Sequence, residues 1–134
     1  MRVFLSYAES DQEVARELAS RLKEAGHTVW FADNAPGEDW ILRVGKALNE
    51  AEALVVLLSP KAMKSDWVRK EIEYALGAVQ YRGRLIPVMV KPTSDIPWIL
   101  KKFPIVRLNK GMAETAREVA AYVDHGFELT PAKA

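Results

Sequence analysis

Six consecutive apolar residues, Ala53-Leu54-Val55-Val56-Leu57-Leu58, decide the fold class of this chain. An unbroken apolar run of this length, without alternating polar residues, is typical of a central strand in a parallel sheet that is covered on both faces. Ser59-Pro60 follows the run and is expected to end the strand. We therefore expect Val55, Val56 and Leu57 in the middle of a sheet that has helices on both sides.

Four further short stretches rich in β-branched and aromatic residues are predicted strands. Between them, apolar side chains recur every three or four residues, as on one face of a helix. This alternation predicts a parallel sheet, and its commonest small form is flavodoxin-like, with strand order 2-1-3-4-5. We therefore expect a single three-layer α/β domain with a five-stranded parallel sheet. The predicted strands are 3–7, 27–32, 53–58, 84–90 and 105–108, and the predicted helices are 11–25, about 38–48, 65–80 and 112–123.

Single residues mark where these elements begin or bend. We expect Ser10 or Asp11 to cap the first helix and Ser65 the helix after the central strand, because a side-chain oxygen there can accept a free backbone N–H. Pro87 lies in the fourth predicted strand and has no N–H to donate, which suggests a bulge or a peripheral position. Residues 91–104 contain three prolines and are predicted to form an ordered loop.

Length and composition limit the possible functions. The chain has 134 residues, the size of one domain, and we expect a folded domain over 1–124 with a flexible tail over 125–134. A net charge of +1 provides no strong field for nucleic acid or an anionic membrane, so neither is an expected partner. Without cysteine, and with only His27 and His125 as imidazole ligands, no metal site is expected. No signal peptide or membrane span is predicted, which makes the cytoplasm the expected location.

Polar residues follow each of the first three predicted strands. Because the carboxyl ends of parallel strands share one edge of the sheet, Ser6-Tyr7-Ala8-Glu9, residues 33–37 and residues 59–66 should lie close together. The next helix carries Trp67 and Glu71, which are four residues apart and so share a helical face. Such a pair could hold a ring and stabilise a positive centre. Alternatively, Trp67 belongs to the core and Glu71 is a surface acid favoured by the helix dipole.

Other uses of this architecture are excluded by what the loops lack. A phosphoacceptor receiver needs an aspartate at the end of the third strand, and here that strand ends Leu57-Leu58-Ser59. A flavodoxin, a nucleotide triphosphatase or a dinucleotide-binding domain needs a phosphate-binding loop after the first strand, but residues 6–11 contain no glycine. Ser6 has no accompanying histidine–acid pair and is not predicted to be a nucleophile. Glu73, two residues from Glu71, is expected in solvent.

An ordered set of short motifs along residues 2–90 resembles the bacterial Toll/interleukin-1 receptor (TIR) domain family. Each motif alone is weak evidence, whereas the ordered set is specific. After Val90 the resemblance depends on the alternation of strands and helices. The motifs are Phe4-Leu5-Ser6-Tyr7 with Asp11, Gly26-His27-Thr28-Val29-Trp30, Gly37-Glu38-Asp39-Trp40, Ala47-Leu48, Val55-Val56-Leu57-Leu58-Ser59-Pro60, Ser65-Asp66-Trp67 and Glu71-Ile72.

The resemblance implies a site and a substrate. Many bacterial members cleave NAD⁺ at the nicotinamide–ribose bond with a glutamate in the helix after the third strand, which corresponds to Glu71. NAD⁺ is then the substrate, and no cofactor is expected. The residues expected to bind the substrate are Ser6, Tyr7, Ala8, Asp33 and Trp67.

The resemblance also implies assembly. In the family, the loop after the second strand bridges neighbouring subunits, and we expect self-association through TIR–TIR contacts. The corresponding assembly loop is Asn34, Ala35, Pro36 and Gly37, which is short and without charge. Ala8-Glu9 stands where some NAD-cleaving relatives carry basic residues.

Three functions remain open. The first is an NAD⁺ glycohydrolase or cyclase in bacterial immune signalling, which releases nicotinamide and either ADP-ribose or a cyclic isomer, depending on whether water or adenine attacks. The second is a non-catalytic module that acts by homotypic assembly. The third is an enzyme similar to nucleoside deoxyribosyltransferases, with a glutamate nucleophile, which the motif set favours least. The presence of Glu71 with Trp67 favours the first.

Overall fold

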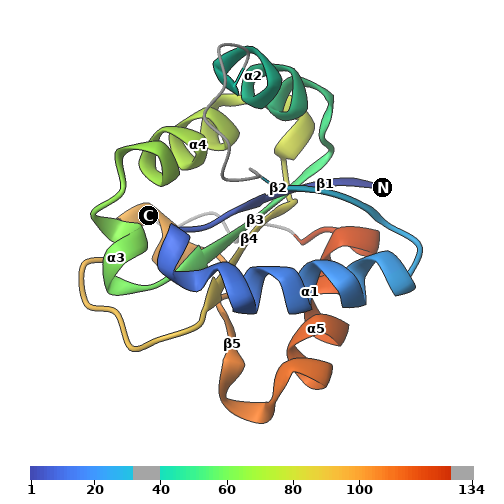
Figure 1. Cartoon of the computed structure of the whole chain (residues 1–134), viewed down its shortest axis with the longest axis vertical. Helices are drawn as coiled ribbons and strands as arrows, with labels where there is room; N and C mark the ends of the chain where they lie inside the picture. The colour runs from blue at the N-terminus through green and yellow to red at the C-terminus, as the bar shows by residue number, and fades with distance from the viewer. Residues whose placement is uncertain (32–39, 128–134) are drawn as a thin grey trace, which may run out of the picture.

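Five parallel strands form one sheet in the computed structural model, which describes residues 1–31 and 40–127. Their order is β2-β1-β3-β4-β5, as predicted (Figure 1). The strands pair in parallel from β1 outward, with Leu5 opposite Val55 of β3. The bounds are β1 (Arg2–Ser6), β2 (Thr28–Phe31), β3 (Ala53–Leu58), β4 (Leu85–Met89) and β5 (Val106–Arg107).

Helices cover both faces of the sheet and complete the predicted three layers. Helices α1 and α5 pack on one face, and α2 and α4 pack on the other (Figure 1). The bounds are α1 (Gln12–Glu24), α2 (Trp40–Glu50), α3 (Pro60–Met63), α4 (Asp66–Gly77) and α5 (Met112–His125), with 3₁₀ turns η1 (Glu9–Asp11), η2 (Val79–Tyr81), η3 (Trp98–Lys102) and η4 (Leu108–Lys110).

The central strand β3 confirms the sequence prediction. All of its residues are completely buried. Because successive side chains of a strand point to opposite faces, Leu54, Val56 and Leu58 contribute to the core beneath α2 and α4. Ala53, Val55 and Leu57 contribute to the core beneath α1 and α5. The same alternation in β1 places Phe4 on the α2–α4 face, and Ser6, two residues later, points to that face as well.

Pro87 corrects the prediction for the fourth strand. It lies opposite Val56 in continuous register, without a bulge, and β4 is not at the edge of the sheet. The N–H of Val90 donates to the carbonyl of Leu58 (3.1 Å), so by alternation the nitrogen of Pro87 faces the β5 side. Since β5 pairs with β4 only from Val88 onward, no residue of β5 stands opposite Pro87.

Both ends of the described chain lie at the amino ends of the strands. The Met1 ammonium is 3.3 Å from Nδ1 of His27, just before β2. The N–H of Phe127 donates to the carbonyl of Gly83 (2.9 Å), just before β4. Phe127 also packs edge-on against Phe103, with ring centroids 5.5 Å apart. Helix α5 therefore leads into a packed residue beyond position 124, and residues 128–134 lie outside the described part of the chain.

Candidate active site

A hydrogen bond between β1 and α4 joins two of the predicted site residues. Ser6 is the last residue of β1, and Glu71 lies in the second turn of α4. The Oγ of Ser6 donates to Oε1 of Glu71 at 2.7 Å. Since β1 is paired with β3 and α4 follows β3, this pair lies at the carboxyl edge of the sheet, by the switch point where ligands bind in such folds.

The local sequence explains why Glu71 is buried. Val68, Ile72 and Ala75 form the buried stripe of α4, and Glu71 falls within that stripe. Ser65 caps the helix as predicted, since its side chain accepts the N–H of Val68 (3.3 Å). Only 7% of Glu71 is exposed, so its interpretation as a surface acid is wrong. A carboxylate in an apolar stripe is unfavourable for folding, which is an indication of function.

Burial changes the acidity of this carboxyl. It raises the pKa of Glu71 from an ordinary value of 4.5 to about 7, while the hydrogen bond from Ser6 acts in the opposite direction. A carboxyl with this pKa exists in both protonation states near neutral pH. The Ser6 hydroxyl can donate only to a lone pair of Glu71, so it favours the ionised form.

Trp67 lies at the start of α4, one turn before Glu71. Its side chain is not part of the core, because 42% of the residue is exposed. The Nζ of Lys70 lies 5.7 Å from the centre of its ring. The alternative interpretation of Trp67 as a core residue is therefore wrong, and its indole is accessible at the same end of α4 as the carboxyl.

Tyr7 and Ala8 follow Ser6 but lie on different sides of the sheet. Ala8 is buried in the core of the α2–α4 face, on the same side as Glu71. The Tyr7 ring packs with the opposite core and lies 6.4 Å from the ring of Phe31. A role of Tyr7 in substrate binding stays a prediction, and this geometry gives it no direct support.

Two groups of predicted residues remain to be placed. Asp33 and the assembly loop of Asn34, Ala35, Pro36 and Gly37 lie outside the described residues. Glu73 lies in solvent on the outer side of α4, as expected from its spacing.

Within residues 1–31 and 40–127, no cluster of three or more histidine and acidic side chains could hold a metal ion. In the same ranges, no helix is long and apolar enough to cross a membrane.

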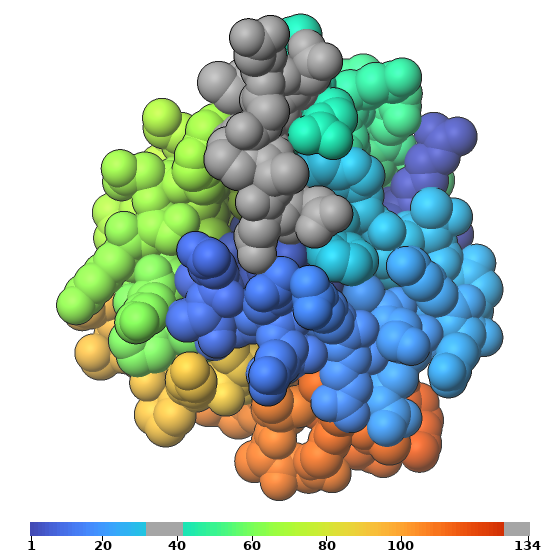
Figure 2. All heavy atoms as spheres, viewed as in Figure 1, coloured from blue at the N-terminus to red at the C-terminus, as the bar shows by residue number. Residues whose placement is uncertain are grey.

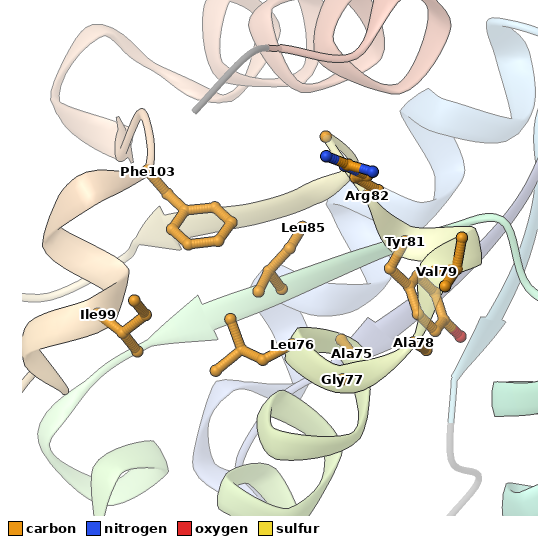
Figure 3. Close-up of a pocket in the computed structure, with 11 residues that line it drawn as sticks. Ala75, Leu76, Gly77, Ala78, Val79, Tyr81, Arg82, Leu85, Ile99 and Phe103 are labelled. Carbon is orange, nitrogen blue, oxygen red and sulfur yellow. The ribbon is translucent and has the colours of Figure 1, made fainter. Parts of the chain in front are cut away.

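An apolar cavity of about 440 Å³ lies elsewhere, between the end of α4, the start of β4 and η3. Figure 3 shows Leu76 of α4 facing Ile99 of η3 and Phe103, the residue directly after η3, around this cavity. Leu85, the first residue of β4, also lines this cavity, which therefore lies at the amino edge of the sheet. No carboxylate lines the cavity, so we place the candidate chemistry at the opposite edge, around Ser6 and Glu71.

Asp11 is a second buried carboxylate, and its contacts differ from the helix cap that the sequence predicted. The sequence predicted Ser10 or Asp11 as the cap of α1. Asp11 stands at the N-cap position, but its side chain makes no hydrogen bond to the helix, so the predicted capping bond is wrong for Asp11. Instead, Oδ2 of Asp11 accepts a hydrogen bond of 2.5 Å from Ser59, and Oδ1 lies 3.5 Å from Nζ of Lys91. Lys91 could not be predicted as a partner of Asp11, because no local pattern in the sequence connects the two residues.

Fold and site together define a flavodoxin-like α/β domain that holds a buried Ser–Glu pair at the carboxyl edge of its sheet. The chain belongs to the TIR domain family, whose model matches residues 3–123. The match extends through β5 and most of α5, beyond the motifs that carried the resemblance.

One curated relative indicates a chemistry within the family. The chain is 23% identical over 121 residues to a probable 2′ cyclic ADP-D-ribose synthase, TcpO, from Methanobrevibacter olleyae. The alignment covers 87% of this chain and 36% of that protein. The chain therefore spans about a third of the length of the relative that it matches.

Solved structures confirm the fold. The TIR domain of the Toll-related receptor TRR-2 from Hydra magnipapillata superposes with a TM-score of 0.75 at 21% identity, covering 92% of this chain and 98% of that one. A metazoan TIR-STING receptor from C. gigas superposes with a TM-score of 0.70 at 23% identity, covering 88% of this chain and 39% of that one.

Proposed function

We propose that this domain cleaves NAD⁺ at the nicotinamide–ribose bond, with Glu71 as the catalytic carboxylate. The observation that carries the proposal is the buried hydrogen bond between Ser6 and Glu71 at the carboxyl edge of the sheet. A purely structural helix would be more stable with an apolar residue at this position of its buried stripe. Membership of the TIR family and the name of the synthase relative support the same chemistry.

The reaction suits a site with one carboxylate. The nicotinamide of NAD⁺ is already cationic and leaves as a neutral molecule, so no general acid is required, unlike in ordinary glycoside hydrolysis. The C–N bond breaks with its electron pair moving to nicotinamide, and the ribose carbon develops oxocarbenium character. An ionised Glu71, oriented by Ser6, would stabilise this charge and accept hydrogen bonds from ribose hydroxyls. The accessible ring of Trp67 would stack against a base of the substrate.

The second reactant determines the product. Attack by water yields ADP-ribose, nicotinamide and a proton, whereas attack by a group of the same ADP-ribosyl unit yields a cyclic isomer, nicotinamide and a proton. The name of the relative from Methanobrevibacter olleyae favours a cyclic product.

The proposal is tested by incubating concentrated protein with NAD⁺ and separating the products by chromatography. Nicotinamide release supports it, and intact NAD⁺ with crowded or assembled protein favours the interaction module.

Self-association is part of the proposed function. We expect activity per molecule to rise steeply with protein concentration, because the family resemblance assigns residues 34–37 to contacts between subunits. The measurement is initial rate per molecule over a hundredfold range of concentration, alongside the sedimentation profile. A constant activity per molecule across that range would contradict this expectation.

Ser6→Ala is expected to shift the pH dependence of cleavage. In the wild type, kcat/KM should rise with pH through about 7, as Glu71 loses its proton. Without the Ser6 hydroxyl, the pKa of Glu71 should rise further, and the midpoint should move up by at least about one pH unit, since a hydrogen bond to a charged group contributes about 1.5–3 kcal/mol. Activity at pH 7 should therefore fall several-fold and recover at pH 9.

The matched control for this experiment is Ser10→Ala, at an exposed serine in the same segment of the chain. Its kcat/KM profile should overlay that of the wild type. A Ser6→Ala profile with an unchanged midpoint would show that the hydrogen bond does not set the acidity of the catalytic group.

A further inference from the structure

A buried acid links three loops at the carboxyl edge of the sheet. The Asp11 carboxylate is completely buried, although it lies at the start of α1. It accepts the Ser59 hydroxyl from the end of β3 and faces the Lys91 ammonium from the segment after β4. In Figure 2, the blue atoms near the start of α1 border both the green surface of α3 and α4 and the gold surface of the segment after β4.

This arrangement is not the one that stability alone would favour. An aspartate that capped α1 with its side chain would stabilise the helix, but this side chain makes no such bond. A buried carboxylate with a single cation partner recovers little or nothing of its desolvation cost, and its best-attested use is to select one arrangement of the chain. Lys91 is 57% exposed, so the pair joins the interior to the surface.

The contacts of Asp11 reach the segment after Ser6 and the segment before the helix of Glu71. Its backbone N–H donates to the carbonyl of Ala8 (2.8 Å), and Ala8 shares the buried core of the α2–α4 face with Val68 and Ile72 of α4. On the other side, the Ser59 hydroxyl that donates to Asp11 also accepts the N–H of Ala62 (3.1 Å) in α3. Asp11 thus connects the segment after Ser6, through its backbone N–H, with the segment that leads into the helix of Glu71, through its carboxylate.

We propose that Asp11 is a positioning residue for the active site, with Ser59 as its hydrogen-bond donor and Lys91 as its counter-ion. The cluster holds the Ala8 segment and α3 in one relative position, so that the substrate enters a preformed site beside Ser6 and Glu71. Where it concerns catalysis, this inference rests on the proposed NAD⁺ cleavage. The links between the loops can be tested without it.

The test combines kinetics with amide hydrogen exchange on four variants. Asp11→Asn keeps the size and an acceptor for Ser59 but removes the charge, Lys91→Gln removes the counter-ion, and Lys91→Arg keeps it. We expect the first two variants to raise KM for NAD⁺ about tenfold, since small misplacements of binding groups carry effects of this order, with kcat changed much less. Lys91→Arg should restore KM to nearly the wild-type value. The double variant Asp11→Asn/Lys91→Gln should be no worse than Asp11→Asn alone, because the two residues act as a pair.

Hydrogen exchange gives a readout that does not depend on turnover. The amides of Asp11 and Ala62 should exchange faster in Asp11→Asn and Lys91→Gln, while α5 remains unchanged; Lys101→Gln, at an exposed lysine, is the control. Unchanged exchange and unchanged KM would overturn the proposal, as would a uniform loss of kcat and of protection throughout the chain. If the wild type never cleaves NAD⁺, the proposed function fails, and the exchange pattern still decides whether the cluster links the loops.

Discussion

Glu71→Gln is expected to lower NAD⁺ cleavage by about 100-fold or more, by analogy with the loss of one preorganised donor from an oxyanion hole. Glutamine keeps the size of the side chain and can still form a hydrogen bond with the Ser6 hydroxyl. It cannot carry the negative charge that faces the developing oxocarbenium centre. Because Glu71 is almost completely buried, little solvent screens that charge, and its removal should appear mainly in kcat.

Glu73→Gln is the matched control, because Glu73 lies on the same helix and in solvent. It should retain most of the wild-type rate. Nicotinamide release should be measured for both variants at a protein concentration at which the wild type is active. Equal cleavage by the wild type and Glu71→Gln would show that the catalytic carboxylate is elsewhere.

The second large effect of Glu71→Gln concerns stability: the substitution that lowers activity is expected to raise the free energy of unfolding relative to the wild type as pH increases. Burial raises the pKa of Glu71 from 4.5 to about 7 in the folded state, so the folded protein binds more protons than the unfolded chain between these values. The stabilisation by protonated Glu71 is fully present below pH 4.5 and is lost as pH rises through about 7. The difference between the two pKa values corresponds to about 3 kcal/mol, at about 1.4 kcal/mol per pKa unit.

The free energy of unfolding should therefore be measured by denaturant titration at pH 5 and at pH 8, for the wild type and Glu71→Gln. Relative to the wild type, the free energy of unfolding of Glu71→Gln should increase by about 2–3 kcal/mol from pH 5 to pH 8, because glutamine does not titrate. The free energy of unfolding of Glu73→Gln should follow that of the wild type at both pH values. A pH-independent difference between wild type and Glu71→Gln would mean that the folded state leaves this carboxyl with its ordinary acidity. A variant that is more stable and inactive would show that the wild type gives up stability to hold a buried charge.

The parts of the fold that were predictable from sequence depend on repeated local patterns. The unbroken run at Ala53–Leu58 indicated a strand covered on both faces, and the alternation of strands and helices indicated the sheet order. The Ser65 cap was also predictable, because a capping side chain acts within its own helix. Glu71 was singled out as the candidate catalytic carboxylate by family resemblance and by its spacing from Trp67.

Two of the features that were predicted wrongly, the role of Asp11 and the place of Pro87, depend on partners distant in sequence. Asp11 has the local signature of a helix cap, but its side chain bonds to Ser59, 48 residues away. The burial of Glu71 had a local signal that was overlooked, since it falls between Val68 and Ile72 in the apolar stripe of α4. Pro87 is tolerated in β4 only because β5 is so short, a fact that no pattern within β4 could reveal.

The placement of Met1 and Phe127 affects how this domain can be tethered. Both residues lie at the amino edge of the sheet, beside His27 and Gly83, whereas Ser6 and Glu71 lie at the carboxyl edge. A surface, a fluorescent protein or a forced-dimerisation module attached ahead of Met1 would therefore lie at the opposite edge from Ser6 and Glu71. Immobilised or artificially clustered molecules can thus be assayed with the edge that carries Ser6 and Glu71 directed toward the bulk solution.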